Sequence, residues 1–117
     1  MDKTTLILLC VFVGLLFFKL QSGRRSQEEV SVMKKAINDG GLLLDVRSPG
    51  EFSGGHIEGA LNIPVGNLQS RLSELGPEDR AIVVYCASGG RSARAAKVLR
   101  AKGFNEVHDL GSISNWK

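Results

Sequence analysis

The stretch Val83-Val84-Tyr85-Cys86-Ala87-Ser88-Gly89-Gly90-Arg91-Ser92 determines how the rest of this chain is interpreted. Its β-branched and aromatic start favours a buried strand, which ends at Cys86. Small residues from Ala87 to Gly90 form a loop, and a helix-forming sequence follows Arg91. Because the N-terminus of a helix attracts negative charge, a thiol at this position is stabilised as a thiolate. The stretch therefore predicts a nucleophilic cysteine.

The loop after Cys86 is suited to bind a small anion. Gly89 and Gly90 can adopt positive φ, so that successive backbone N–H groups can point inward. Arg91 adds a planar cation at the end of the loop. The sequence has no histidine beside the cysteine, so activation would come from the helix and the N–H groups. The alternative is a buried cysteine at the end of a strand, followed by glycines that only form a turn.

Strand-like and helix-like patterns alternate from residue 26 onward, which predicts an α/β domain with a parallel central sheet flanked by helices. We expect helices over residues 26–38, 48–53, 67–75 and 92–102, and strands at 42–44, within 56–64, at 81–85 and at 107–108. The site of such a sheet lies at the carboxyl ends of its strands. Asp45 and Cys86 both fall at such ends.

The N-terminal segment contains an uncharged apolar run of 13 residues, Leu6 to Phe18. This run is shorter than the ~20 residues of a spanning helix, but Lys3 and Lys19 can snorkel to the interfaces. No small-residue cleavage site follows the run, and its apolar surface on every side disfavours a buried core helix. We therefore expect a single-pass membrane anchor through residues 4–20, with a division into residues 1–25 (anchor and basic linker) and 26–117 (globular domain).

Charge is distributed unevenly between these two parts. Residues 1–25 contain four Lys or Arg and one Asp, whereas residues 26–117 contain 11 basic and 11 acidic residues. The positive-inside rule then favours a cytoplasmic globular domain, with an exported, periplasmic domain as the alternative. The neutral domain predicts no nucleic-acid partner. The spacing of Cys10, Cys86, His56 and His108 suggests no metal site, and we expect no cofactor.

Three blocks of the chain resemble the rhodanese-like family of single-domain sulfurtransferases. They are Leu44-Asp45-Val46-Arg47 with Glu51-Phe52, then His56-Ile57-Glu58-Gly59-Ala60-Leu61-Asn62-Ile63-Pro64, and finally Tyr85-Cys86 with Gly89, Arg91, Ser92 and Ala95. The resemblance covers residues 26–116 and implies a parallel sheet flanked by helices. The chain differs from the family pattern at Gly111-Ser112, where many members have two glycines.

In this family a cysteine takes a sulfane sulfur from a donor such as thiosulfate and becomes a persulfide. It then passes the sulfur to a thiophilic acceptor such as cyanide or a thiol. The resemblance implies that Cys86 is the nucleophile and that Arg91 binds the oxyanion of the donor. N–H groups for the persulfide would come from Ala87, Ser88, Gly89 and Gly90. Asp45 and Arg47 would brace the loop or take part in catalysis, and structural roles would fall to Glu51, His56 and Asn62.

Two alternatives to this enzyme remain open. Cys86 to Arg91 spans six residues, one fewer than the phosphate-sized loop of the related dual-specificity phosphatases, so sulfur transfer is preferred over phosphate or arsenate chemistry. The other alternative is a membrane-tethered binding module that carries a persulfide, or senses redox state, without high turnover.

Overall fold

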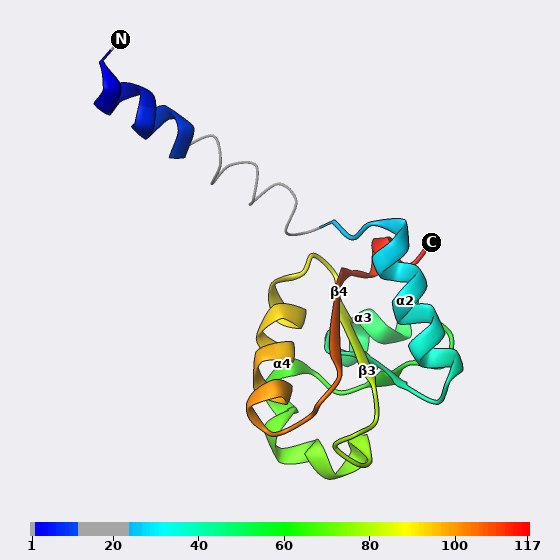
Figure 1. The fold of residues 1–117 in the computed structure, drawn as a ribbon. Coiled ribbons are helices and arrows are strands. Elements are labelled where there is room, and N and C mark those ends of the chain that lie inside the picture. Colours follow the sequence, from blue (N-terminus) through cyan, green and yellow to red (C-terminus); the bar gives the residue numbers. More distant parts are fainter. Residues whose placement is uncertain (1, 12–23) are drawn as a thin grey trace.

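The computed structural model describes residues 2–11 and 24–117, and the second range forms a parallel sheet with helices on both faces (Figure 1). The sheet has the strand order β2-β1-β3-β4, and all of its pairs are parallel. This arrangement confirms the predicted α/β class. In chain order the elements are α2 (Gln27–Asn38), β1 (Leu42–Asp45), α3 (Pro49–Ser53), β2 (Leu61–Asn62), the 3-10 helices η1 (Val65–Asn67) and η2 (Gln69–Leu75), β3 (Ile82–Cys86), α4 (Gly90–Ala101), β4 (Val107–Ser112) and the 3-10 helix η3 (Ile113–Asn115).

β3 lies inside the sheet and is buried along its whole length. Successive side chains of a strand point to opposite faces. Val84 and Cys86 accordingly belong to the hydrophobic cluster that contains Leu99 of α4. Val83 and Tyr85 belong to the second cluster, which α2 closes from the other face. Cys86 therefore ends an inner strand with its side chain on the α4 side of the sheet.

The short helix α3 is fixed at its start by reciprocal hydrogen bonds. The Ser48 hydroxyl accepts from the backbone N–H of Glu51 at 3.2 Å, and the Glu51 carboxylate accepts from the backbone N–H of Ser48 at 3.2 Å. Pro49 occupies the first turn, where its missing N–H costs nothing. This capping box sets the position of the Glu51 carboxylate at the carboxyl edge of the sheet.

Two elements differ from the sequence-based expectation. The helix predicted over residues 67–75 is present as 3-10 helix and not as one continuous α-helix: Asn67 ends η1 without capping η2, and Arg71 has a non-helical φ of −123°. No side chain caps either element, and Leu68 and Leu75 are fully buried. β4 extends to Ser112, beyond the two residues expected, and a bulge in its pairing brings Ser112 opposite Cys86.

The prediction of a single-pass membrane protein with a cytoplasmic domain is contradicted. No helix within the described ranges is long and apolar enough to cross a bilayer. Residues 3–11 are helical. Nine residues rise only about 14 Å, against about 30 Å of hydrocarbon in a bilayer. The rest of the expected anchor, residues 12–20, lies outside the described residues.

Candidate active site

The sulfur of Cys86 lies against the first turn of α4. Its side chain is fully buried, and its Sγ accepts hydrogen bonds from the backbone N–H groups of Gly89 at 3.0 Å and Ser92 at 3.3 Å. Gly89 precedes the helix with a φ of 111°, in the left-handed region that glycine adopts without strain. The chain thus curls around the sulfur and holds it at the positive end of the helix dipole.

This environment favours the ionised form of the thiol. Burial alone would raise the pKa of Cys86, but hydrogen bonds from the Ser92 hydroxyl and from the N–H groups of Ser92, Gly89 and Ser88 outweigh it, so the pKa lies below its ordinary value of 9.0. The Ser92 hydroxyl also lies 3.1 Å from the carbonyl oxygen of Gly89, and it can donate its single proton to either acceptor. The thiolate is the nucleophilic form of cysteine.

Arg91 is held beside the loop by a carboxylate from α3. Its two terminal nitrogens donate to the two oxygens of Glu51 at 2.7 and 3.0 Å. The Arg91 guanidinium, together with the backbone N–H of Ser48, lowers the pKa of Glu51 to about 2. Both side chains remain more than one third exposed, so solvent screens the pair. An anionic ligand that approaches Cys86 would therefore meet an arginine already shared with Glu51.

Asp45 and Arg47 form a buried ion pair at the end of β1. Asp45 is fully buried, and its Oδ2 accepts from the Arg47 guanidinium at 2.7 and 3.0 Å. The same guanidinium donates to the carbonyl oxygen of Gly55 at 2.7 Å and lies 5.7 Å from the ring centre of Tyr85. The Asn62 amide donates to the carbonyl oxygens of both Asp45 and Arg47. The Asn62 amide thus links the end of β2 to β1, and the Arg47 guanidinium lies beside Tyr85 of β3.

The structure brings most of the predicted site residues to one edge of the sheet. Within the described residues, the N–H groups of Gly89 and Ser92 lie at hydrogen-bond distance from the Cys86 sulfur, and the N–H of Ser88 adds to the lowering of its pKa. No hydrogen bond joins the sulfur to Asp45 or Arg47 among these residues. Ala87 lies in the bend after β3 and Gly90 begins α4; donation from their N–H groups to a persulfide stays a prediction.

Sequence reasoning gave no role to Ser92 and only a structural role to Glu51. Ser92 is the third residue of α4, and the first N–H groups of any helix lack intrahelical partners, so this donor could have been expected. The contact of Glu51 with Arg91 joins residues 40 positions apart, and no local pattern indicates it.

Neither histidine contacts Cys86 among the described residues. The ring of His56 stacks on Phe52 with centroids 3.7 Å apart, and its Nδ1 lies 2.9 Å from the Phe52 carbonyl oxygen. His108 Nε2 lies 2.8 Å from a carboxylate oxygen of Glu106. Within residues 2–11 and 24–117, no group of three or more His, Cys, Asp or Glu side chains is placed to hold a metal ion.

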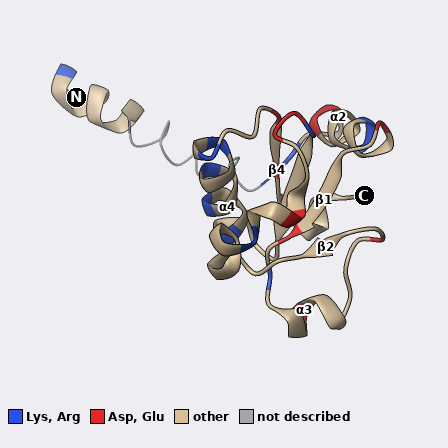
Figure 2. Cartoon of the chain, turned by 90° about the horizontal axis from the view of Figure 1, so that it is seen from below, with Lys and Arg blue, Asp and Glu red and all other residues tan. Residues whose placement is uncertain are grey.

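A row of basic residues extends along α4 from the loop. Its members are spaced three residues apart, and the helix contains no acidic residue. They are Arg91, Arg94, Lys97 and Arg100. Residues three apart are neighbours on a helix surface, and Figure 2 shows the basic positions repeating along α4. The row adds positive potential on this side of Cys86, which attracts anionic reactants.

The lowered pKa predicts a thiolate that persists below the ordinary range of a cysteine. The ultraviolet absorbance of the thiolate can be titrated as the difference between the Cys10→Ala chain and the Cys10→Ala/Cys86→Ser chain. We expect a midpoint below 9.0, shifted upward by Ser92→Ala because one hydrogen bond to the sulfur anion is lost. A midpoint at or above 9.0 would contradict this electrostatic assignment.

Comparison with known proteins gives consistent matches. The family described as "Rhodanese-like domain" matches residues 29–117. The Bacillus subtilis (strain 168) protein YqhL is 34% identical, covering 97% of this chain and 93% of YqhL. A protein of Allochromatium vinosum named "Sulfurtransferase" is 42% identical, and the match covers 64% of this chain and 70% of that protein. The solved structure of the human single-domain sulfurtransferase TSTD1 superposes with a TM-score of 0.65 at 28% identity, over 80% of this chain and 94% of that one.

Proposed function

The chain belongs to the rhodanese-like family of sulfurtransferases, and we propose that it moves a sulfane sulfur through a persulfide on Cys86. The observation that supports this most directly is the sulfur of Cys86, held by two backbone N–H groups at the start of α4. Such a setting stabilises a thiolate before transfer and a persulfide anion after it. The proposed donor is thiosulfate or a similar anionic sulfane compound, and the proposed acceptor is cyanide or a thiol.

The reaction consists of two displacements at sulfur. The Cys86 thiolate attacks the outer sulfur of thiosulfate, the sulfur–sulfur bond of the donor breaks, and sulfite leaves with the bonding electron pair. The persulfide formed on Cys86 is then attacked at its terminal sulfur by the acceptor. The second sulfur–sulfur bond breaks, the acceptor keeps the sulfur, and the Cys86 thiolate returns. No further reactant is consumed.

In this proposal, Arg91 binds the oxyanion of the donor and Glu51 positions and partly neutralises that arginine. The bidentate contact leaves other guanidinium N–H groups for a ligand, since a guanidinium has five donors. Asp45 and Arg47 do not touch the reacting sulfur in this proposal; their ion pair and the bond from Arg47 to Gly55 brace the strand ends next to the loop. The basic row on α4 favours the approach of an anionic donor.

Steady-state formation of thiocyanate from thiosulfate and cyanide tests the proposal on the full chain. We expect saturable activity that depends on Cys86. A folded chain that gives no thiocyanate with thiosulfate, and none with other sulfane donors, would count against an enzyme of this class. A Cys86 persulfide that forms quickly but turns over slowly would instead favour the persulfide-carrying module.

Opposite charge changes at Arg91 and Glu51 should move the KM for thiosulfate in opposite directions. Arg91→Gln removes the cation and should raise the KM about tenfold, because a charge-assisted contact to the donor is lost. Glu51→Gln removes the competing carboxylate and should lower the KM about twofold. If Arg91 served only to pair with Glu51, both variants would raise the KM or neither would change it.

A further inference from the structure

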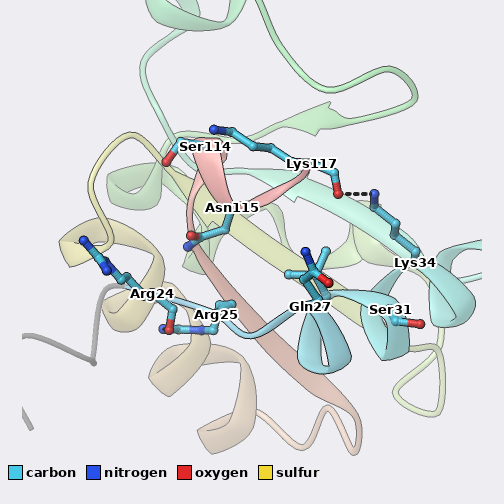
Figure 3. Close-up of a pocket in the computed structure, with 9 residues that line it drawn as sticks. Arg24, Arg25, Gln27, Ser31, Lys34, Ser114, Asn115 and Lys117 are labelled. Carbon is cyan, nitrogen blue, oxygen red and sulfur yellow. Dashed lines mark hydrogen bonds between the residues drawn. The ribbon is translucent and has the colours of Figure 1, made fainter.

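A cavity of about 730 Å³ lies between the start of α2 and the last residues of the chain (Figure 3). Among the described residues that line it, none comes from the loop between Cys86 and Arg91, and none has an acidic side chain. Val30 is the only large apolar residue in this set. Four of the lining residues are basic: Arg24, Arg25, Lys34 and Lys117. The cavity is therefore a second region that attracts anions, apart from the chemistry of Cys86.

Two of these cations are held in place by other parts of the domain. Arg25, whose side chain is only 15% exposed, donates to the carbonyl oxygen of Asp109 at 2.8 Å and lies 3.6 Å from its carboxylate. Lys34 donates to the carbonyl oxygen of Lys117 at 2.8 Å and lies 5.3 Å from the ring centre of Trp116. These contacts order both cations before a ligand arrives, which reduces the entropy that binding costs.

The other two cations can contact a ligand without breaking an ion pair. The side chains of Arg24 and Lys117 form no ion pair with any described residue, and both residues are exposed. One of them precedes α2 and the other ends the chain, so the cavity receives cations from both of its walls.

The basic groups are spread along α2 and do not meet at one point. Gln27, Ser31 and Lys34 line the cavity at spacings of four and three residues, so they lie on one face of the helix. The helix rises roughly 10 Å between the first and the last of them. Figure 3 shows Arg24 and Lys34 on opposite sides of the cavity. A single small anion cannot contact both, whereas a chain of linked anionic groups can.

We propose that this cavity binds a chain of linked phosphate groups. Each phosphate presents several strong acceptor oxygens, and guanidinium groups match these oxygens with paired N–H donors. Gln27 and Ser31 add amide and hydroxyl donors to the same wall. Such a chain occurs in inorganic polyphosphate and in nucleoside triphosphates. Binding here is independent of the proposed sulfur transfer, because no step at Cys86 requires it.

Isothermal titration calorimetry of the full chain at low salt, without added divalent cations, tests the ligand class. Tripolyphosphate should bind with one molecule per chain and about tenfold more tightly than orthophosphate or citrate. ATP carries the same three phosphates on a nucleoside and distinguishes the two sources. With Val30 as the only large apolar lining residue, we expect ATP to bind no more tightly than tripolyphosphate. Tighter binding of ATP would support the same phosphate site and assign its ligand to the nucleotides.

Two double variants with the same loss of charge test the location. Arg24→Gln/Lys117→Gln should weaken tripolyphosphate binding about tenfold, because two charge-assisted contacts are lost. Arg94→Gln/Lys97→Gln removes one arginine and one lysine from exposed positions of α4 that do not line the cavity, and should weaken binding less than about twofold. Cys86→Ser should bind tripolyphosphate like the unaltered chain. Circular dichroism checks that each variant is folded.

Three results would overturn the proposal. They are the absence of tripolyphosphate binding at millimolar concentration, equal weakening by the two double variants, and binding of citrate as tight as that of tripolyphosphate. Equal weakening would mean that the anion responds only to the net charge of the protein. None of these results bears on persulfide formation at Cys86, so failure here is distinguishable from failure of the proposed function.

Discussion

Replacing Cys86 with serine should lower thiosulfate-dependent thiocyanate formation by about a thousandfold or more. A serine hydroxyl is scarcely ionised near neutral pH and forms no persulfide, so both displacements are lost. The two N–H groups that now meet the sulfur would meet an oxygen of similar geometry, and we expect the fold to survive. Activity is measured on purified full chain whose circular dichroism matches that of the unaltered protein.

The matched control is Cys10→Ser, since Cys10 is the other free cysteine and is exposed. This variant should keep the activity of the unaltered chain, because Cys10 lies outside the site. Activity that survives Cys86→Ser and disappears in Cys10→Ser would show that the nucleophile had been assigned to the wrong thiol.

Replacing Asp45 with alanine should cost about 3 kcal/mol of the free energy of unfolding. The change leaves the Arg47 guanidinium, now 8% exposed, without its carboxylate partner. A buried charge that loses its partner is strongly unfavourable, whereas removal of both charges costs much less. The double variant Asp45→Ala/Arg47→Met should therefore be more stable than Asp45→Ala alone. Urea denaturation followed by circular dichroism measures both differences.

Glu74→Ala provides the comparison for this prediction. It breaks the pair between Arg71 and Glu74, which is also local in sequence but is exposed at both side chains, 37% and 43%. Because solvent screens this pair, Glu74→Ala should lower the free energy of unfolding far less than Asp45→Ala does. Equal effects of the two substitutions, or a double variant less stable than Asp45→Ala, would contradict the role assigned to the buried pair.

The strand, loop and helix around Cys86 could be predicted because each is encoded by neighbouring residues. The β-branched run favours a strand, the small residues favour a loop and the residues after Arg91 favour a helix. Tertiary contacts in the folded protein agree with these local preferences. Asp45 could be predicted in the same way, because it directly follows the apolar run of three leucines that forms a strand. The parallel order of the sheet follows from the alternation of strands and helices.

The features that were missed depend on contacts between distant parts of the chain. Glu51 reaches Arg91 only after α3 and α4 have been placed at the same edge of the sheet. A cavity rich in basic side chains is lined by residues from 24–34 and from 114–117, which lie near opposite ends of the domain in sequence. The segment from residue 67 to 75 has leucines at helical spacing, but it lacks a side-chain cap and forms 3-10 helix, with Leu68 and Leu75 buried. Hydrophobicity alone also led to the membrane anchor, for which the described residues provide no spanning helix.

Intact-mass measurement of the full chain after incubation with thiosulfate tests the central claim most directly. We predict a gain equal to the mass of one sulfur atom, located on Cys86 by peptide mapping, lost on addition of cyanide and absent from Cys86→Ser. A folded chain whose mass stays unchanged with thiosulfate and with other sulfane donors, or one that carries the added sulfur on Cys10, would contradict the account.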